Sequence, residues 1–391
     1  MDKILSPFRQ GRKLNTLFLS TIFISLHYAL IIYVNSSFLS KFFSENQVSY
    51  LYIIGSIINT ILLLNASKVL EKIGIYKFTI YAVVIEFIAT FGLFISLSPF
   101  LVGLYFLTHL ITISLLLFSF DILVEDFTKD NSKTGSIRAT YLTITNITIF
   151  VSPILVAFLL VNNVYSNVYI ISAVLLIPLY YMIKRLKDVH IAKINHIRLR
   201  ETTMEYIKSK DLYNVFVTQF LLQLFYAFMI VYTPIYMSQF IGFSWSEIGI
   251  IFTVMLLPFV IFEIPVGELA DYKYGEKEFM TIGFVIMGLA TICVSFVTVK
   301  VFWIWALVLF MTRIGASFVE VTSDSYFFKR VDQEKTDVIS FYRITRPLSF
   351  IIAPLIATVT LGFIPFQYMF IIIGSIMIVG AHYSLALTDT K

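Results

Sequence analysis

The sequence predicts an all-α polytopic membrane protein, on three observations. Of its 391 residues, 58% are hydrophobic and only 14% are charged, whereas soluble domains are about 25% charged. The mean hydropathy is +0.87. The apolar residues form continuous runs of about 20 residues, the length that a helix needs to cross a bilayer. Strands of a membrane barrel would alternate with a period of two. A soluble fold could not cover so much apolar surface with so few charges.

The apolar runs are arranged in two sets of six around one long polar stretch, residues 185–212. This arrangement predicts an N-terminal six-helix bundle over residues 1–187, a cytoplasmic linker over 188–210 and a C-terminal six-helix bundle over 211–391. The expected twelve transmembrane helices cover residues 15–39, 47–68, 77–97, 100–124, 139–161, 167–184, 213–238, 246–267, 279–298, 302–326, 341–361 and 365–387.

The first helix follows a basic leader with no small-residue cleavage site, which favours a cytoplasmic N-terminus over a removable signal peptide. With that orientation, 24 of the 29 Lys and Arg residues lie on the cytoplasmic side and only Lys41 and Lys300 lie outside. Basic loops stay cytoplasmic. Both termini and residues 185–212 are therefore expected on the cytoplasmic side of the plasma (inner) membrane. The net charge of +5 is therefore a topology signal, with the lipid bilayer and not nucleic acid as the partner.

An internal repeat relates the two sets of helices. An offset of 199 places Asp121 on Glu320, and an offset of 198 places Tyr28 on Tyr226. Each half contains an even number of helices, so the halves enter the membrane from the same side and form a pseudo-symmetric parallel repeat. The offset of 199 also places Glu125 on Asp324 and, after two extra loop residues, an offset of 201 places Tyr141 on Tyr342 and Pro153 on Pro354.

A loop motif occurs once in each half. After the eighth stretch, the segment IPVGELADYKYGEK contains Gly267, Asp271 and Gly275 and resembles the G-x-L-A-D-R-x-G-R-K loop of the major facilitator superfamily. The loop after the second stretch keeps an acid, a base and a turn glycine but begins with serine, and the later loop has one extra residue before its glycine. The resemblance implies the twelve-helix, two-bundle fold of that family, in which the loop acid faces a helix end of the opposite half. The first loop contributes Ser67, Glu71, Lys72 and Gly74.

Charged residues form stripes on three of the predicted helices. Such charges cost about 2.5–3.5 kcal/mol each at the centre of a membrane helix, so they need partners or water. One interpretation is a charged intracellular gate that also binds protons, with Glu320 first and Asp121 second; the other is a static ring of ion pairs. The stripe residues are Asp121 and Glu125 on the fourth helix, Arg313, Ser317, Glu320 and Asp324 on the tenth, and Arg343 and Arg346 on the eleventh.

Deeper polar residues are the candidates for a substrate cavity, because the resemblance implies that helices one, four, seven and ten line it. His27 is interpreted either as a cavity residue or as a hydrogen-bonded packing histidine, and His109 as a packing or interface residue. Glu86 and Glu263 are interpreted as proton sites or as groups that snorkel or pair near the cytoplasmic face. The full candidate set is His27, Asn35, Gln219, Gln223, Tyr226 and Arg313.

Several motifs are missing from the sequence. There is no G-x-x-x-x-G-K-[ST] loop, so ATP is not the expected energy source. The H-E-x-x-H and G-x-S-x-G motifs, which would suggest an enzyme, are also missing. The single Cys293 excludes an internal disulfide and a cysteine-based metal site. We therefore expect no cofactor, no metal and no catalytic residues.

These observations predict a secondary active transporter that moves a small organic solute by alternating access. Proton coupling is expected, and the aromatic, sparsely charged cavity helices favour efflux of an amphipathic compound by a monomer. The fifth helix contains Ser152 and Pro153 but lacks the glycine-rich pattern of many drug/proton antiporters in that family. The alternatives are uptake of a polar solute such as a sugar or an organic anion, with Arg313 as the anion partner, a lipid flippase, or a non-transporting receptor or scaffold.

Overall fold

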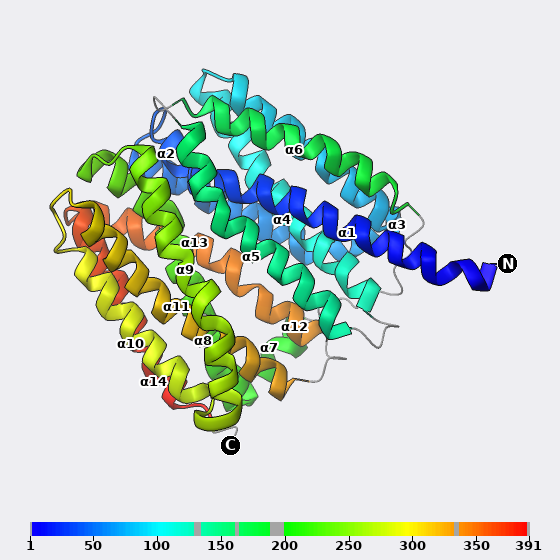
Figure 1. Ribbon diagram of the computed structural model, residues 1–391. Coiled ribbons are helices and arrows are strands. Elements are labelled where there is room, and N and C mark those ends of the chain that lie inside the picture. The colour runs from blue at the N-terminus through cyan, green and yellow to red at the C-terminus, as the bar shows by residue number, and fades with distance from the viewer. Residues whose placement is uncertain (1, 129–133, 161–163, 188–198, 332–335, 389–391) are drawn as a thin grey trace. The chain divides into compact units, whose positions relative to one another are not determined.

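The computed structural model describes residues 2–128, 134–160, 164–187, 199–331 and 336–388. These residues form helices joined by short turns, without strands in any described range, which confirms the predicted all-α class (Figure 1). The helices are α1 (Asp2–Ile32), α2 (Asn35–Leu39), α3 (Glu45–Ile95), α4 (Pro99–Thr128), α5 (Thr134–Leu159), α6 (Ser166–Lys184), α7 (Leu199–Lys208), α8 (Lys210–Ile235), α9 (Trp245–Leu269), α10 (Glu276–Val294), α11 (Phe302–Arg330), α12 (Thr336–Arg343), α13 (Thr345–Leu361) and α14 (Met369–Leu385).

The chain is a multi-pass membrane protein. Within the described residues, 11 helical segments are long and apolar enough to cross a bilayer, and a shorter apolar segment, Thr143–Leu159, lies where the predicted fifth helix falls. In hydrocarbon each backbone N–H and C=O must be satisfied inside its own segment, and helices do this. The first predicted boundary was wrong: α1 ends at Ile32, and the short helix α2 begins at Asn35.

The chain divides into two compact units. The first unit comprises residues 1–42 and 57–194, and the second comprises residues 43–56 and 195–391. In the first unit α1 packs against α4, α5 and α6. In the second unit α10 packs against both α11 and α14, and α8 packs against α11, α13 and α14 (Figure 1). The domain boundaries predicted from the sequence stay a prediction.

The two loop motifs share one backbone conformation at their turn glycines. Gly74 has φ 78° and ψ 155° inside α3, and Gly275 has φ 94° and ψ 159° at the start of α10. Glycine adopts positive φ without the steric cost that a Cβ brings. The extra residue of the second loop is taken up by a π-helical turn, η3 (Ala270–Tyr274), closed by a hydrogen bond of 3.0 Å from the Gly275 amide to the Ala270 carbonyl. The inserted residue therefore widens the helical turn before Gly275, while Gly275 itself keeps the backbone conformation of Gly74.

The linker predicted between the bundles contains helix α7, which packs on the second unit. Tyr206 is buried, donates a hydrogen bond of 2.8 Å to the Val338 carbonyl and contacts the rings of Phe216 and Phe341. The Ser209 hydroxyl then accepts a hydrogen bond from the Leu212 amide and caps α8, as serine does at helix N-termini. This part of the linker is an ordered connection to α8.

Candidate functional site

The polar stripes predicted on the seventh and tenth helices meet inside the second unit, where α8 lies against α11. Tyr226 donates a hydrogen bond of 2.6 Å to Oε2 of Glu320, and Ser323 donates one of 3.2 Å to Oε1 of Gln219. A hydrogen bond to a carboxylate is stronger than one between neutral groups. The structure thus brings three predicted site residues together, while Gln223 lies half-buried on the same helix.

Arg313 is the buried cation of this cluster. Its residue exposure is 1%, and its guanidinium lies 5.0 Å from the ring centroid of Phe225 and 5.3 Å from that of Tyr226. Such cation–π contacts stabilise a guanidinium away from water. Its Nε atom has no hydrogen-bond partner among the described residues. Arg313 therefore keeps a donor free beside two aromatic faces and two turns from Glu320.

The acids toward the C-terminal ends of α4 and α11 accept hydrogen bonds from tyrosines. In the second unit Tyr342 donates to Asp324 at 3.4 Å, and in the first unit Tyr141 donates to Asp121 at 3.5 Å. The two tyrosines correspond in the repeat, but these two acids do not. The predicted gate joins the two halves and stays a prediction. Three of its side chains lie outside the described part of the chain: Glu125, Ser67 and Asp271. Four others are exposed: Glu71, Lys72, Arg343 and Arg346.

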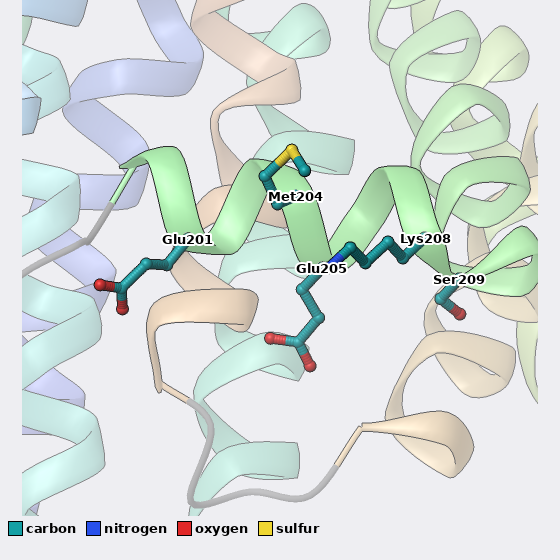
Figure 2. A pocket seen from close by; sticks show the side chains of 5 residues that line it. All are labelled: Glu201, Met204, Glu205, Lys208 and Ser209. Atoms are coloured by element: carbon teal, nitrogen blue, oxygen red, sulfur yellow. The ribbon is translucent and has the colours of Figure 1, made fainter.

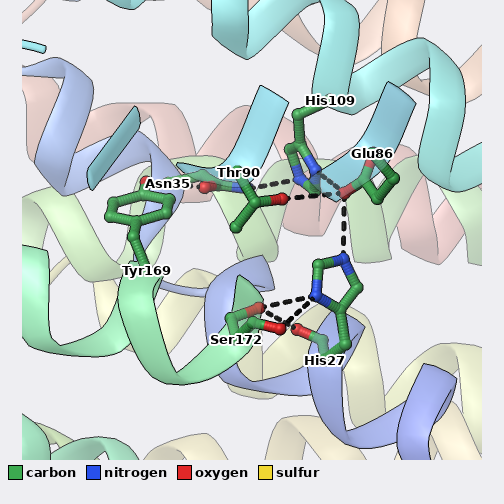
Figure 3. A network of polar contacts seen from close by, with 7 residues as sticks. All are labelled: His27, Asn35, Glu86, Thr90, His109, Tyr169 and Ser172. Atoms are coloured by element: carbon green, nitrogen blue, oxygen red, sulfur yellow. Dashed lines mark hydrogen bonds and ion pairs between the residues drawn. The ribbon is translucent and has the colours of Figure 1, made fainter. Parts of the chain in front are cut away.

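The first unit contains a second polar cluster, formed by His27 of α1, Glu86 of α3 and His109 of α4 (Figure 3). Oε1 of Glu86 lies 2.9 Å from Nε2 of His27 and 2.5 Å from Nδ1 of His109. Thr90 donates a third hydrogen bond of 3.2 Å to the same oxygen. The two rings and the carboxylate are buried, with residue exposures of 0%, 0% and 2% for His27, Glu86 and His109. We call these three residues the His–Glu–His cluster.

Hydrogen-bond partners around the cluster determine where its protons lie. Nδ1 of His27 lies 2.9 Å from the carbonyl oxygen and 2.8 Å from the hydroxyl oxygen of Ser172. The hydroxyl donates to the His27 carbonyl at 3.0 Å and the Ser172 carbonyl can only accept, so Nδ1 carries a proton. Tyr169 donates to Oδ1 of Asn35 at 2.8 Å, so the amide nitrogen of Asn35 faces Nε2 of His109 at 3.3 Å and donates to it. Nδ1 of His109 must then be the protonated nitrogen of a neutral ring. One further proton is shared between Nε2 of His27 and Oε1 of Glu86, and the cluster is neutral overall.

Among the described residues, the His–Glu–His cluster is also the one group of histidine, cysteine and carboxylate side chains close enough to share a cation, with ligand atoms within 4.8 Å of one another. The sequence pointed to His27 and Glu86 separately and assigned His109 to packing or an interface. No sequence spacing reveals that three separate helices bring them together. The available signal was that each is an ionisable residue in an apolar run.

An open surface hollow lies elsewhere, along α7 of the second unit. Its lining includes Glu201 and Glu205, which extend to the same side of the helix (Figure 2). None of its lining residues belongs to the predicted cavity set. The remaining lining residues are Met204, Lys208 and Ser209.

The family model described as Major Facilitator Superfamily matches residues 215–390. No curated protein sequence matches the chain significantly.

Several solved structures have a similar fold. The nucleoside transporter NupG aligns with a TM-score of 0.74 and 13% identity, covering 96% of this chain and 98% of that chain. An auto-inhibited POT family peptide transporter aligns with a TM-score of 0.75 and 11% identity, covering 97% and 98%. A bacterial homologue of the human lysosomal transporter Spinster aligns with a TM-score of 0.71 and 11% identity, covering 97% and 93%. At these identities the likeness concerns the fold.

Proposed function

Because this chain belongs to the major facilitator superfamily, we propose that it is a secondary active transporter that moves a small organic solute by alternating access and couples this movement to protons. The observation that carries the proposal is the contact of Tyr226 with Glu320, on the helix that also holds the buried Arg313. A fold alone does not specify a function. A half-buried carboxylate on the same helix as a buried guanidinium supplies chemistry that a static packing interface does not need.

Proton coupling requires a group whose charge changes during the transport cycle. Burial favours the protonated, neutral form of a carboxyl group, and a nearby guanidinium favours the ionised form. When a substrate or a helix movement draws Arg313 away, Glu320 would take up a proton; when Arg313 returns, Glu320 would release it. Tyr226 would hold the carboxyl group in place in both states, because its hydroxyl can donate or accept. Asp121, in the corresponding place of the other half, is the second candidate, and His27 the third.

The substrate proposed first is an amphipathic organic compound that leaves the cell. The rings of Phe225 and Tyr226 lie at the guanidinium of Arg313, and the ring of Phe259 lies against Tyr226 with their centroids 6.2 Å apart. Flat aromatic faces bind apolar bodies, and the few polar groups orient them. Gln219 and Gln223 would add hydrogen bonds to the polar part of such a compound.

The experiment that tests coupling uses the purified protein in liposomes. A ligand-stabilisation screen over nucleosides, peptides, sugars, organic anions, lipids and dyes first supplies a substrate, and a pH gradient is then imposed. Glu320→Gln should abolish gradient-driven accumulation and leave substrate exchange across the membrane intact. The matched control is Glu268→Gln, which neutralises an exposed carboxylate of α9 and should retain accumulation. If wild-type transport ignores the gradient, the carrier is a uniporter and the coupling proposal fails.

A second candidate function, uptake of an organic anion, is favoured by the unpartnered Nε of Arg313. A guanidinium recognises a carboxylate or phosphate through two parallel hydrogen bonds, which an ammonium group cannot reproduce. Arg313→Lys should then reduce transport of an anionic substrate while leaving transport of a neutral amphipathic substrate near its wild-type rate. Equal loss for both substrate classes would point to a general structural role of Arg313.

We further propose that the protein acts as a monomer in the plasma (inner) membrane with both termini in the cytoplasm. The proposed orientation rests on the 24-to-2 division of basic residues and on the positive-inside rule. The gate formed by the charged stripes and the two motif loops belongs to the same proposal. In it, the acid of each loop closes the cytoplasmic side by facing a helix end of the opposite half.

A further inference from the structure

We propose that the His–Glu–His cluster of the first unit is a binding site for one divalent transition-metal ion of the zinc class, held by Nε2 of His27, Nδ1 of His109 and the carboxylate of Glu86. Two imidazoles and one glutamate with an open fourth position form a ligand set used by zinc proteins. The three ligand atoms come from α1, α3 and α4, lie within 4.8 Å of one another and are buried. The site lies wholly inside one unit, so its ion would stay with that unit.

The fold does not require polar side chains at these positions. In the repeat, the offset of 198 for the first helix of each half places His27 on Phe225. The offset of 201 between the turn glycines places Glu86 on Met287, and the offset of 199 for the fourth helix places His109 on Val308. All three counterparts are apolar. Since burying polar groups costs free energy, the cluster serves something that apolar packing would not provide.

An unused oxygen is the second observation that points to a ligand. Oε2 of Glu86 is fully buried and has no hydrogen-bond partner among the described residues, although Oε1 of the same carboxylate has three close contacts. An unpaired buried acceptor is costly. A cation bound by the carboxylate would give this oxygen an opposite charge nearby and remove this cost.

The hydrogen bond beyond His27 has the arrangement found around metal ligands. Nδ1 of His27 contacts the Ser172 carbonyl at 2.9 Å and so leaves Nε2 toward the cluster (Figure 3). Metal-binding histidines almost always donate their second ring N–H to such an acceptor. The far nitrogen of His109 contacts Asn35, which Tyr169 holds in turn. Both rings are therefore oriented from outside.

Loading the ion is an exchange that balances. The proton shared by His27 and Glu86 leaves, and the proton on Nδ1 of His109 relocates to Nε2 of the same ring. The Asn35 amide then rotates so that its oxygen accepts from His109, while the Tyr169 hydroxyl changes from donor to acceptor. Metal–ligand bonds of 2.0–2.2 Å place ligand atoms about 3.3 Å apart in a tetrahedral site. The two N···O separations of 2.9 and 2.5 Å therefore widen by less than 1 Å. A water molecule or hydroxide takes the fourth position.

The test measures the metal content of the full-length protein. Cells are grown with zinc or cobalt, because the buried site would load during folding, and the protein is purified in detergent with a chelator wash. Wild type should retain one ion per chain by elemental analysis, and the cobalt form should show the visible absorption of a tetrahedral site. Glu86→Gln and His109→Gln should lose the ion. His382→Gln, which removes an exposed histidine of α14, should keep it.

Two further measurements distinguish a lost site from a misfolded variant. X-ray absorption of the wild-type zinc form should show two imidazole ligands with nitrogen and oxygen at 2.0–2.2 Å. Tyr169→Phe keeps all three ligands but removes the hydroxyl that holds Asn35, so the zinc affinity measured by chelator competition should fall about 10–100-fold. Wild type that carries no stoichiometric ion, or ligand variants that retain it, would overturn the proposal and leave the cluster as a proton-sharing hydrogen-bond network.

Discussion

Replacement of Gly315 by alanine should destabilise the second unit, because α10 and α11 touch through their backbones at this point. A Cβ atom added to Gly315 would lie 2.4 Å from the Gly283 carbonyl oxygen and 2.4 Å from the Met287 amide nitrogen. Both obstacles are backbone atoms, which cannot move aside by changing rotamer. The helices would have to separate by about 1 Å to reach the 3.4 Å at which ordinary contact begins.

The expected cost follows from this separation. Overpacking in a dense interior costs about 1–3 kcal/mol, and moving two helices apart also weakens the dispersion contacts along their whole crossing. Gly283 meets Gly315 from the other side, where an added Cβ would lie 2.7 Å from the Gly315 carbonyl oxygen, so neither helix offers space. We expect Gly315→Ala to lose about 3 kcal/mol of unfolding free energy, at the upper end of that range.

The assay is SDS-induced unfolding of the purified protein in mixed micelles, with Gly362→Ala as the matched control. Gly362 is exposed, and a Cβ there would meet only the Val359 carbonyl oxygen at 3.5 Å, so its effect should stay within about 0.5 kcal/mol. Because Gly315 lies between Arg313 and Glu320 on α11, transport should also fall. If Gly315→Ala unfolds at the same SDS fraction as the control, the reasoning from helix contact is wrong.

Three further predictions concern topology, coupling and the gate. Reporter fusions at Asn163 and Asn195 should report opposite compartments, and the same compartment for both would break the twelve-helix arrangement. Tyr226→Phe removes the hydrogen bond to Glu320 and should weaken gradient-driven accumulation in liposomes while exchange continues; unchanged accumulation would show that this contact is not needed for coupling. Asp271→Asn should bias the protein toward its inward-open state, because the attraction that closes the cytoplasmic side is lost; an unchanged spin-label distance across that face would count against the gate.

The membrane class and the positions of most helices could be predicted from the sequence, because they depend on local properties. A run of apolar residues long enough to cross hydrocarbon must be helical wherever it lies in the fold. The stripe that joins Arg313 to Glu320 could be predicted for the same reason, since helical periodicity alone brings such residues to one face. The repeat even matched the turn glycines Gly74 and Gly275, which both have positive φ.

Boundaries and turns needed the structure, because neighbouring contacts decide them. The apolar pattern predicted that the first helix continues through Asn35. In the structure α1 ends at Ile32, and the side chain of Asn35 contacts His109. The extra residue before Gly275 was evident in the sequence. Only the structure showed that a π-helical turn accommodates it.

The sequence by itself determined that this protein crosses the membrane many times, that its halves are related and that ionisable residues lie at membrane depth. Only the tertiary structure decided which of those residues meet. His27 and Glu86 are 59 positions apart, and Glu86 and His109 are 23 apart, so no periodicity of a single helix links them. Their contact depends on the packing of α1, α3 and α4 in three dimensions. That packing is set by the fit of many side chains along several helices at once, which a linear pattern of residues does not record.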